Sequence, residues 1–226
     1  MPAAGGLRQR LIPYLDIEKL AGTEAQRTPF EFLTVPAFVS GGGLAAVNRD
    51  FPKLEKAGNF PLDELDYGPG FAAFIEKIKG PEFRMAVQRK FNINLEGLET
   101  RLTVRGFADP SDGGIHTDIR SKVVTGLIYL NDAWESPGGR LRLLRNAHDI
   151  EDFVAEVPPV GGMLLMFKRA DNSWHGHKPF SGVRRTIQVN WIDPSKDKPR
   201  RGDGVWIRRI KRAWSRSTGS ARQPGT

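Results

Sequence analysis

Short apolar runs separated by Gly and Pro, from residue 102 onward, constrain the fold of this chain more than any other feature. The breaks fall at Pro110, 113–114, 137–139, 158–159 and 161–162. Short runs bounded by turn-forming residues are typical of β-strands, and a series of them is typical of an antiparallel sandwich or barrel. We expect one strand region to begin at 102–107 and continue through His116, and a buried strand at 163–167.

The first 100 residues show mostly helical patterns. Apolar residues recur with helical spacing at 42–48, 71–79 and 82–91. The run at 33–38 predicts a strand that enters the sheet. We therefore expect a supporting region of helices with a strand at 1–100, a β core at 101–195 and a tail at 196–226.

Composition sets the outer limits. A chain of 226 residues that is 39% hydrophobic can bury one good-sized core, so we expect one main domain with extensions. The absence of cysteine excludes disulfides, thiolate metal sites and cysteine nucleophiles. Residues 1–22 lack the apolar core of a signal peptide, and no run reaches the about 18 apolar residues of a membrane span. We expect a cytoplasmic protein without a transmembrane segment.

The tail holds much of the net charge of +8. Residues 205–214 can form an amphipathic helix with Trp206, Ile210 and Trp214 on one stripe. Such a helix suits docking to an anionic membrane surface or an acidic partner, and it equally suits packing against the core. Nucleic acid is not an expected partner, because no base-stacking array accompanies the charge. The sequence leaves the oligomeric state open.

Two histidines and an aspartate have the spacing of a metal site. His116 and Asp118 are separated by one residue, and residues i and i+2 of a strand point to the same face. His175 must come from a distant strand folded alongside. Two imidazoles and one carboxylate can hold one face of Fe(II) and leave the opposite face open. A His-x-Asp triplet also occurs by chance in structural roles, so this prediction depends on the further residues below.

An arginine follows the last of these histidines. Alternation over 183–191 puts the side chains on two faces: Arg185, Ile187, Val189 and Trp191 on one, and Arg184, Thr186, Gln188 and Asn190 on the other. An arginine in line with apolar side chains resembles an inward-facing cation, which is unfavourable unless a carboxylate meets it. We therefore predict that Arg185 binds an anion and that Arg184 is its solvent-side neighbour. The guanidinium fork suits a carboxylate better than lysine would.

Residues 105–192 resemble the catalytic core of Fe(II)/2-oxoglutarate dioxygenases, in particular the prolyl 4-hydroxylase and hypoxia-type prolyl hydroxylase branch. The matching pieces are the His116-Thr117-Asp118 triplet, the strand 126–131, the turn 138–141, Trp174-His175, Arg185 and Trp191. The resemblance implies a double-stranded β-helix (jelly-roll, cupin-like) core, mainly β with flanking helices.

The resemblance also implies roles for these residues. His116, Asp118 and His175 would hold Fe(II), and Arg185 with Tyr129 would bind the distal carboxylate of 2-oxoglutarate. Tyr129 shares a predicted strand face with Thr125 and Leu127. The implied reaction uses O2, releases succinate and CO2, and hydroxylates a substrate C–H bond, with ascorbate supporting turnover.

His177 is an alternative third ligand, since it has the same strand parity as His175. We prefer His175, because Trp174-His175 followed by Pro179 and a turn with Gly182 fits the family layout better. His177 would then lie behind the ligands or face the substrate. His148 lies in a polar segment and is expected at the surface.

The substrate is left open. A protein or peptide is slightly favoured over a small molecule or glycan. The basic residues predicted near the site would suit an anionic substrate: Arg120, Lys122, Arg140, Arg142 and Arg145. Two other classes of function are alternatives to the hydroxylase. A non-catalytic metal-binding barrel docking to an anionic partner disagrees with the intact set of ligands, Arg185 and Tyr129. A cupin-like metal hydrolase leaves Arg185 unexplained.

Overall fold

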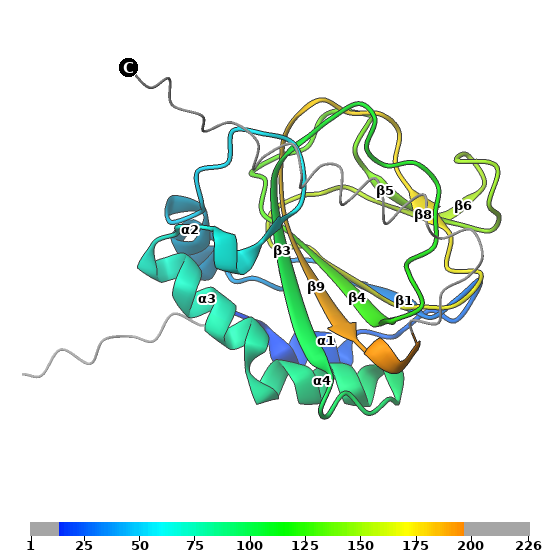
Figure 1. The fold of residues 1–226 in the computed structure, drawn as a ribbon, viewed down its shortest axis with the longest axis horizontal. Coiled ribbons are helices and arrows are strands. Elements are labelled where there is room, and N and C mark those ends of the chain that lie inside the picture. The colour runs from blue at the N-terminus through cyan, green and yellow to red at the C-terminus, as the bar shows by residue number, and fades with distance from the viewer. Residues whose placement is uncertain (1–13, 197–226) are drawn as a thin grey trace, which may run out of the picture.

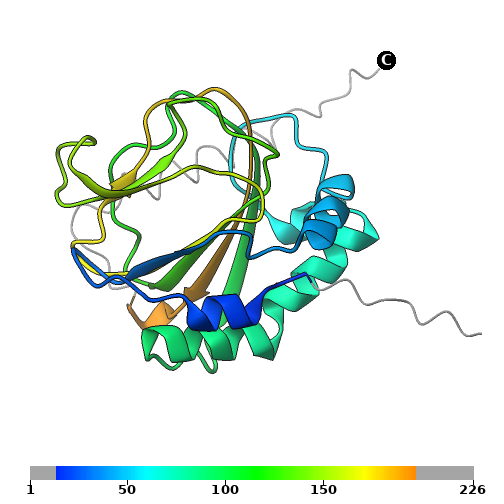
Figure 2. The same ribbon diagram turned by 180° about the vertical axis from the view of Figure 1, so that it is seen from behind.

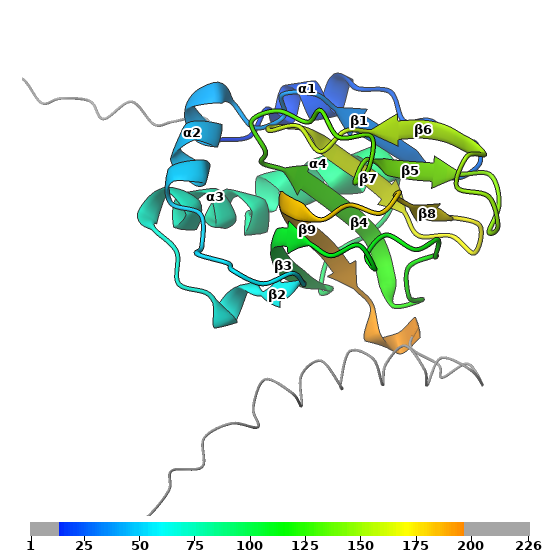
Figure 3. The same cartoon turned by 90° about the horizontal axis from the view of Figure 1, so that it is seen from above.

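Two antiparallel sheets form the body of the protein in the computed structural model, which describes residues 14–196 (Figure 1). The larger sheet has the strand order β1-β7-β4-β9-β3-β2, and the smaller has the order β6-β5-β8 (Figure 3). The strands are β1 (Phe32–Val35), β2 (Phe60–Pro61), β3 (Glu99–Ala108), β4 (Lys122–Tyr129), β5 (Leu141–Leu144), β6 (Phe153–Val157), β7 (Leu164–Lys168), β8 (His175–Gly176) and β9 (Gly182–Ile192).

Helices cover the outer face of the larger sheet, as Figure 2 shows from behind. They are α1 (Ile17–Gly22), α2 (Gly41–Arg49), α3 (Pro69–Lys79) and α4 (Pro81–Phe91), with short 3-10 turns η1 (Leu62–Glu64) and η2 (Pro194–Lys196). Side chains of these helices and of the sheet form one continuous apolar core. Within it, the rings of Phe83 and Trp191 lie 5.8 Å apart between centroids. This packing fixes the apolar face of β9 toward the helices.

A second apolar core lies between the two sheets. Phe32, Leu165 and Phe167 come from the larger sheet, and Leu141 and Leu143 come from the smaller one. Tyr129 belongs to this core as well. Both faces of the larger sheet are therefore covered, one by helices and one by the smaller sheet.

The predicted helices and most predicted strands are present. The helices expected at 42–48, 71–79 and 82–91 correspond to α2, α3 and α4, and each begins one or two residues earlier than predicted. The proline at the start of α3 and of α4 suits the first turn of a helix, where no backbone donor is required. The strand expected at 33–38 ends earlier, at Val35, because Pro36 follows and Ala37 has a positive φ of 50°.

One strand prediction is wrong. The strand that begins near residue 102 does not continue through His116, because β3 ends at Ala108. A turn follows, in which the backbone N–H of Asp112 donates to the carbonyl of Asp109, and the Asp109 side chain accepts from the Ser111 N–H. Aspartate side chains that bond the backbone two residues on favour such turns. His116 and Asp118 therefore lie on a loop between two strands.

The region predicted to support the core also contributes two strands to the larger sheet. β1 pairs with β7, and β2 pairs with β3. The helix predicted at 205–214 and the rest of the basic tail after Lys196 lie outside the described residues. None of the helices within residues 14–196 combines the length and apolar character that a membrane crossing needs. The cytoplasmic location stays a prediction.

Candidate active site

His116 and His175 face each other across a small antiparallel bridge. The backbone N–H of each donates to the carbonyl of the other at 3.0 Å, and their ring centroids are 4.4 Å apart. Nδ1 of His116 lies 2.7 Å from the carbonyl of Gly114, and Nδ1 of His175 lies 2.9 Å from that of Ser173. Since a carbonyl only accepts, each Nδ1 donates its proton, and each Nε2 is the ring nitrogen left to bind a metal.

Asp118 is the third member of this group and is only 6% exposed. Its Oδ1 accepts a hydrogen bond from Lys122 Nζ at 2.6 Å, and its Oδ2 accepts one from Thr125 Oγ1 at 2.5 Å. Burial by itself would raise the pKa of Asp118. The positive charge of Lys122, the charge that His175 carries when it is protonated below its own pKa, and the two hydrogen bonds outweigh burial and lower the pKa of Asp118 to about 2. The carboxylate is therefore ionised at neutral pH and held in one orientation.

The three side chains form a compact donor set. One ligand atom from each of His116, Asp118 and His175 lies within 4.8 Å of the others, and no second group of this kind occurs within residues 14–196. Burial lowers the pKa of His175 to about 4, so its ring is neutral at physiological pH, as a metal ligand must be. Two neutral imidazole nitrogens and one carboxylate oxygen are the donor set of non-haem Fe(II) sites. The residues fit the ion that the sequence predicts.

His177 lies outside this group. Its Nδ1 donates to the carbonyl of Lys178 at 2.8 Å, and its backbone N–H donates to the carbonyl of Gly113 at 2.8 Å. Burial, and next the positive charge of Arg184, lower the pKa of His177 to about 4. The structure thus brings His175, and not His177, together with His116 and Asp118.

Gly113 supports the loop that carries the first two members of the group. It has a positive φ of 87°, and a Cβ at this position would overlap the ring of His177. We expect Gly113→Ala to lower the free energy of unfolding by about 1–3 kcal/mol, measured by urea denaturation. Gly114→Ala is the matched control, since a Cβ at Gly114 meets no atom within 4 Å. Equal stability of the two variants would contradict this role of Gly113.

A second polar cluster lies on the face shared by β4 and β9. Tyr129 is fully buried, and its hydroxyl interacts with Arg184 but makes no hydrogen bond of normal geometry to a described residue. The guanidinium carbon of Arg184 lies 5.5 Å from the Tyr129 ring centroid, and Arg184 Nε donates to the carbonyl of Gly139 at 2.9 Å. Burial raises the pKa of Tyr129, and Arg184 partly opposes this rise. A buried hydroxyl without an acceptor beside a buried cation forms a pair of groups that an anion would satisfy.

The predicted orientation of Arg184 and Arg185 is wrong. The alternation did group the residues correctly, but Ile187, Val189 and Trp191 face the helices. Arg184 is only 5% exposed and lies beside Tyr129. The guanidinium of Arg185 instead lies 5.1 Å from the ring centroid of Phe51. Because the larger sheet is covered on both faces, the apolar face packs on helices and the polar face surrounds the site.

The sequence prediction missed several residues that support the site. On the face of Arg184, Thr186 lies opposite Tyr129 and Asn190 lies opposite Thr125, and all of these are buried. Thr125 Oγ1 also lies 3.1 Å from Asn190 Oδ1. The signal in the sequence was the row of polar residues at alternate positions of β9. When such a row is buried, its members need partners inside the fold.

Most of the basic residues predicted near the site are paired with acids. Lys122 pairs with Asp118, Arg140 with Glu156, Arg142 with Glu151 and Glu156, and Arg145 with Asp152. These pairs neutralise most of the predicted basic edge. Arg120 differs, since it forms no ion pair with any described residue and its Nε is buried without a hydrogen-bond partner.

Residues 107–193 match the family model described as the 2OG-Fe(II) oxygenase superfamily. The structure resembles a prolyl-4-hydroxylase from Pseudomonas putida, with a TM-score of 0.52, 17% identity, and coverage of 78% of this chain and 97% of that one. It also resembles a prolyl 4-hydroxylase from Phytophthora capsici, with a TM-score of 0.54, 14% identity, and coverage of 92% and 78%.

A third similar structure is the viral collagen prolyl hydroxylase of Paramecium bursaria Chlorella virus-1 in complex with 2OG. It has a TM-score of 0.50, 14% identity, and coverage of 72% of this chain and 96% of that one. No curated protein sequence matches the chain. The matches confirm the predicted jelly-roll core, mainly β with flanking helices.

Proposed function

We propose that this enzyme hydroxylates an unactivated C–H bond while converting 2-oxoglutarate and O2 to succinate and CO2, in keeping with the match of residues 107–193 to the 2OG-Fe(II) oxygenase superfamily. The observation that carries the proposal is the compact group of His116, Asp118 and His175. The buried phenol of Tyr129 lies on β4, four residues from the Thr125 that holds Asp118, and the cation of Arg184 lies beside it on the paired strand β9. The first group suits a metal ion, and the second pair suits one carboxylate of a dicarboxylate.

Fe(II) would be held by the Nε2 atoms of His116 and His175 and by one oxygen of Asp118. Bound there, it would supply the activation of O2, which no protein side chain provides. Thr125 and Lys122 hold the carboxylate of Asp118, and the carbonyls of Gly114 and Ser173 orient the two rings. Such contacts around ligands fix their orientation and tune their basicity.

Arg184 and Tyr129 would bind the distal carboxylate of 2-oxoglutarate. A guanidinium and a phenol can each donate to carboxylate oxygens, and burial strengthens these charge-assisted hydrogen bonds. The anion would also supply the partner that the Tyr129 hydroxyl lacks. We assign this role to Arg184 in place of Arg185, because Arg184 is the arginine beside Tyr129.

The three similar structures described above are prolyl hydroxylases, which supports a protein or peptide substrate slightly more than a small molecule or glycan. Ascorbate is proposed as a supporting reductant. We also propose that the basic tail, residues 197–226, docks to an anionic surface or partner.

Calorimetric titration of 2-oxoglutarate into anaerobic protein tests the proposal without a substrate. We expect binding to require both Fe(II) and an intact site, with no comparable heat in metal-free protein. Metal-loaded, folded protein that binds no 2-oxoglutarate would contradict the hydroxylase and favour the non-catalytic metal-binding barrel.

A further inference from the structure

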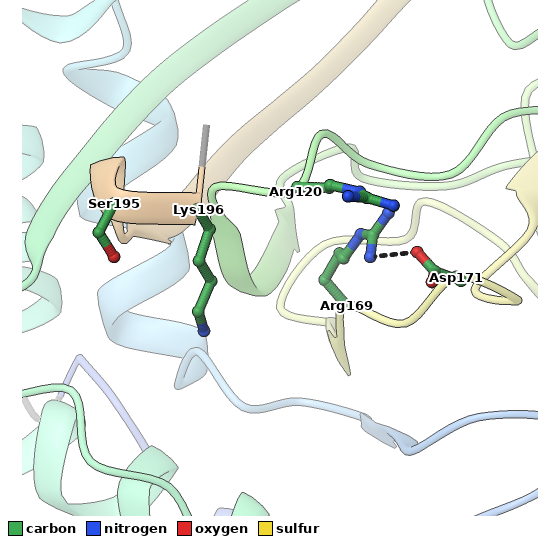
Figure 4. A pocket seen from close by; sticks show the side chains of 5 residues that line it. All are labelled: Arg120, Arg169, Asp171, Ser195 and Lys196. Atoms are coloured by element: carbon green, nitrogen blue, oxygen red, sulfur yellow. Dashed lines mark hydrogen bonds and ion pairs between the residues drawn. The ribbon is translucent and has the colours of Figure 1, made fainter. Parts of the chain in front are cut away.

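A basic depression of about 470 Å³ lies near Asp118, outside the ligand group. Its lining comes from three parts of the chain: Arg120 from the loop after Asp118, Arg169 and Asp171 from the segment after β7, and Ser195 and Lys196 from η2. Figure 4 shows the guanidinium groups of Arg120 and Arg169 at one side and Lys196 at the other. Three cations and one carboxylate thus line one open space.

Arg120 is the part of this lining that most needs a partner. It is half-buried, and its Nε is buried without an acceptor. A buried donor without an acceptor is unfavourable, and more so for a charged group. The other predicted edge cations have acids beside them, whereas Arg120 has no such acid among residues 14–196. An external anion in the depression would offset the charge of its guanidinium.

Arg169 links the depression to the ligand group. Its side chain is 13% exposed, its Nη1 donates to Asp171 at 2.7 Å, and its Nε donates to the backbone carbonyl of Asp118 at 3.2 Å. These contacts hold the guanidinium in place beside Arg120. Lys196 is more exposed and makes only a 3.5 Å ion pair with Asp193, so its ammonium can reach a ligand in the depression.

We propose that this depression is a binding subsite for a phosphate group carried by the substrate. The proposal rests on the proposed hydroxylase function, because the subsite would place an anionic substrate next to the metal ligands. Two guanidinium groups and an ammonium suit a phosphomonoester, which carries about two negative charges at neutral pH and has three acceptor oxygens. Arg120 and Lys196 would contact the phosphate, and Arg169 would support it.

The first test measures the binding of inorganic phosphate to the full-length, metal-free protein by calorimetry at constant ionic strength. We expect Arg120→Gln to weaken binding about tenfold or more, and Lys196→Gln to weaken it less. Lys77→Gln is the matched control, because it removes one exposed positive charge from α3. No binding, or equal binding in all four proteins, would overturn the subsite.

A second probe separates a substrate group from free phosphate. Glycerol 2-phosphate, a simple phosphomonoester, is expected to bind with the same dependence on Arg120 and Lys196. Binding of inorganic phosphate alone would overturn the assignment to a substrate.

The third arm locates the anion relative to the metal ligands. In Mn(II)-loaded protein, we expect enhanced ³¹P relaxation of phosphate in wild type and a clear reduction in Arg120→Gln. Enhancement that is unchanged in Arg120→Gln would show that phosphate binds elsewhere, which overturns the proposal. Failure of the hydroxylase function would appear separately, as absent binding of 2-oxoglutarate to Fe(II)-loaded protein.

Discussion

Asp118→Ala is expected to lower Fe(II)-dependent succinate formation at least about 100-fold and to reduce bound iron. The carboxylate is the one anionic donor of the group, and Thr125 and Lys122 already fix its orientation. Removing it leaves two imidazoles and the partly buried Lys122, which hold a divalent cation poorly. Iron content by metal analysis and succinate by chromatography measure the two effects.

Two histidine variants control this result. His175→Ala should lose activity as Asp118→Ala does, whereas His177→Ala should keep it within about tenfold. Both remove a buried, neutral imidazole from neighbouring positions of the chain. Loss of iron in His177→Ala, with retention in His175→Ala, would show that the ligand set is wrong.

Arg184→Gln is expected to raise the KM for 2-oxoglutarate about 10–100-fold, because a buried charge-assisted contact to the distal carboxylate is lost. Arg185→Gln is a matched control on the same strand, and it should change the KM little. The two side chains differ in direction: Arg184 lies beside Tyr129, and Arg185 lies over Phe51. Initial rates at varied 2-oxoglutarate distinguish them.

The opposite outcome is informative as well. If Arg185→Gln raises the KM and Arg184→Gln does not, Arg185 binds the distal carboxylate, as the alternation in the sequence predicts. Arg184→Lys refines the test, since lysine keeps the charge without the fork and should give an intermediate KM.

The ligand group could be predicted from the sequence because its chemistry is strict. Few residue types bind Fe(II), and a His-x-Asp pair with a distant histidine leaves few alternatives. The local structure was not predictable in the same way. His116 and Asp118 converge from a loop, and their convergence depends on the bridge between His116 and His175, which joins distant parts of the chain.

The arginine shows where sequence alternation stops being informative. Period-two patterning separated Arg184 from Arg185 correctly, yet it cannot tell which face meets the site. In a sheet covered on one side only, the apolar face is the interior. Here helices cover one face and the smaller sheet covers the other, so the polar face of β9 lies inside as well. The tertiary packing resolves the direction, because Trp191 packs against Phe83 on the helix side and Arg184 is buried beside Tyr129 on the other.

Formation of succinate from 2-oxoglutarate by the purified full-length protein, with Fe(II) and ascorbate in air, tests the central claim most directly. Enzymes of this class turn over 2-oxoglutarate slowly without their substrate, so we predict succinate that depends on Fe(II) and O2. This activity should disappear with a chelator and in Asp118→Ala. Folded, iron-loaded wild-type protein that forms no more succinate than Asp118→Ala would contradict the proposed function.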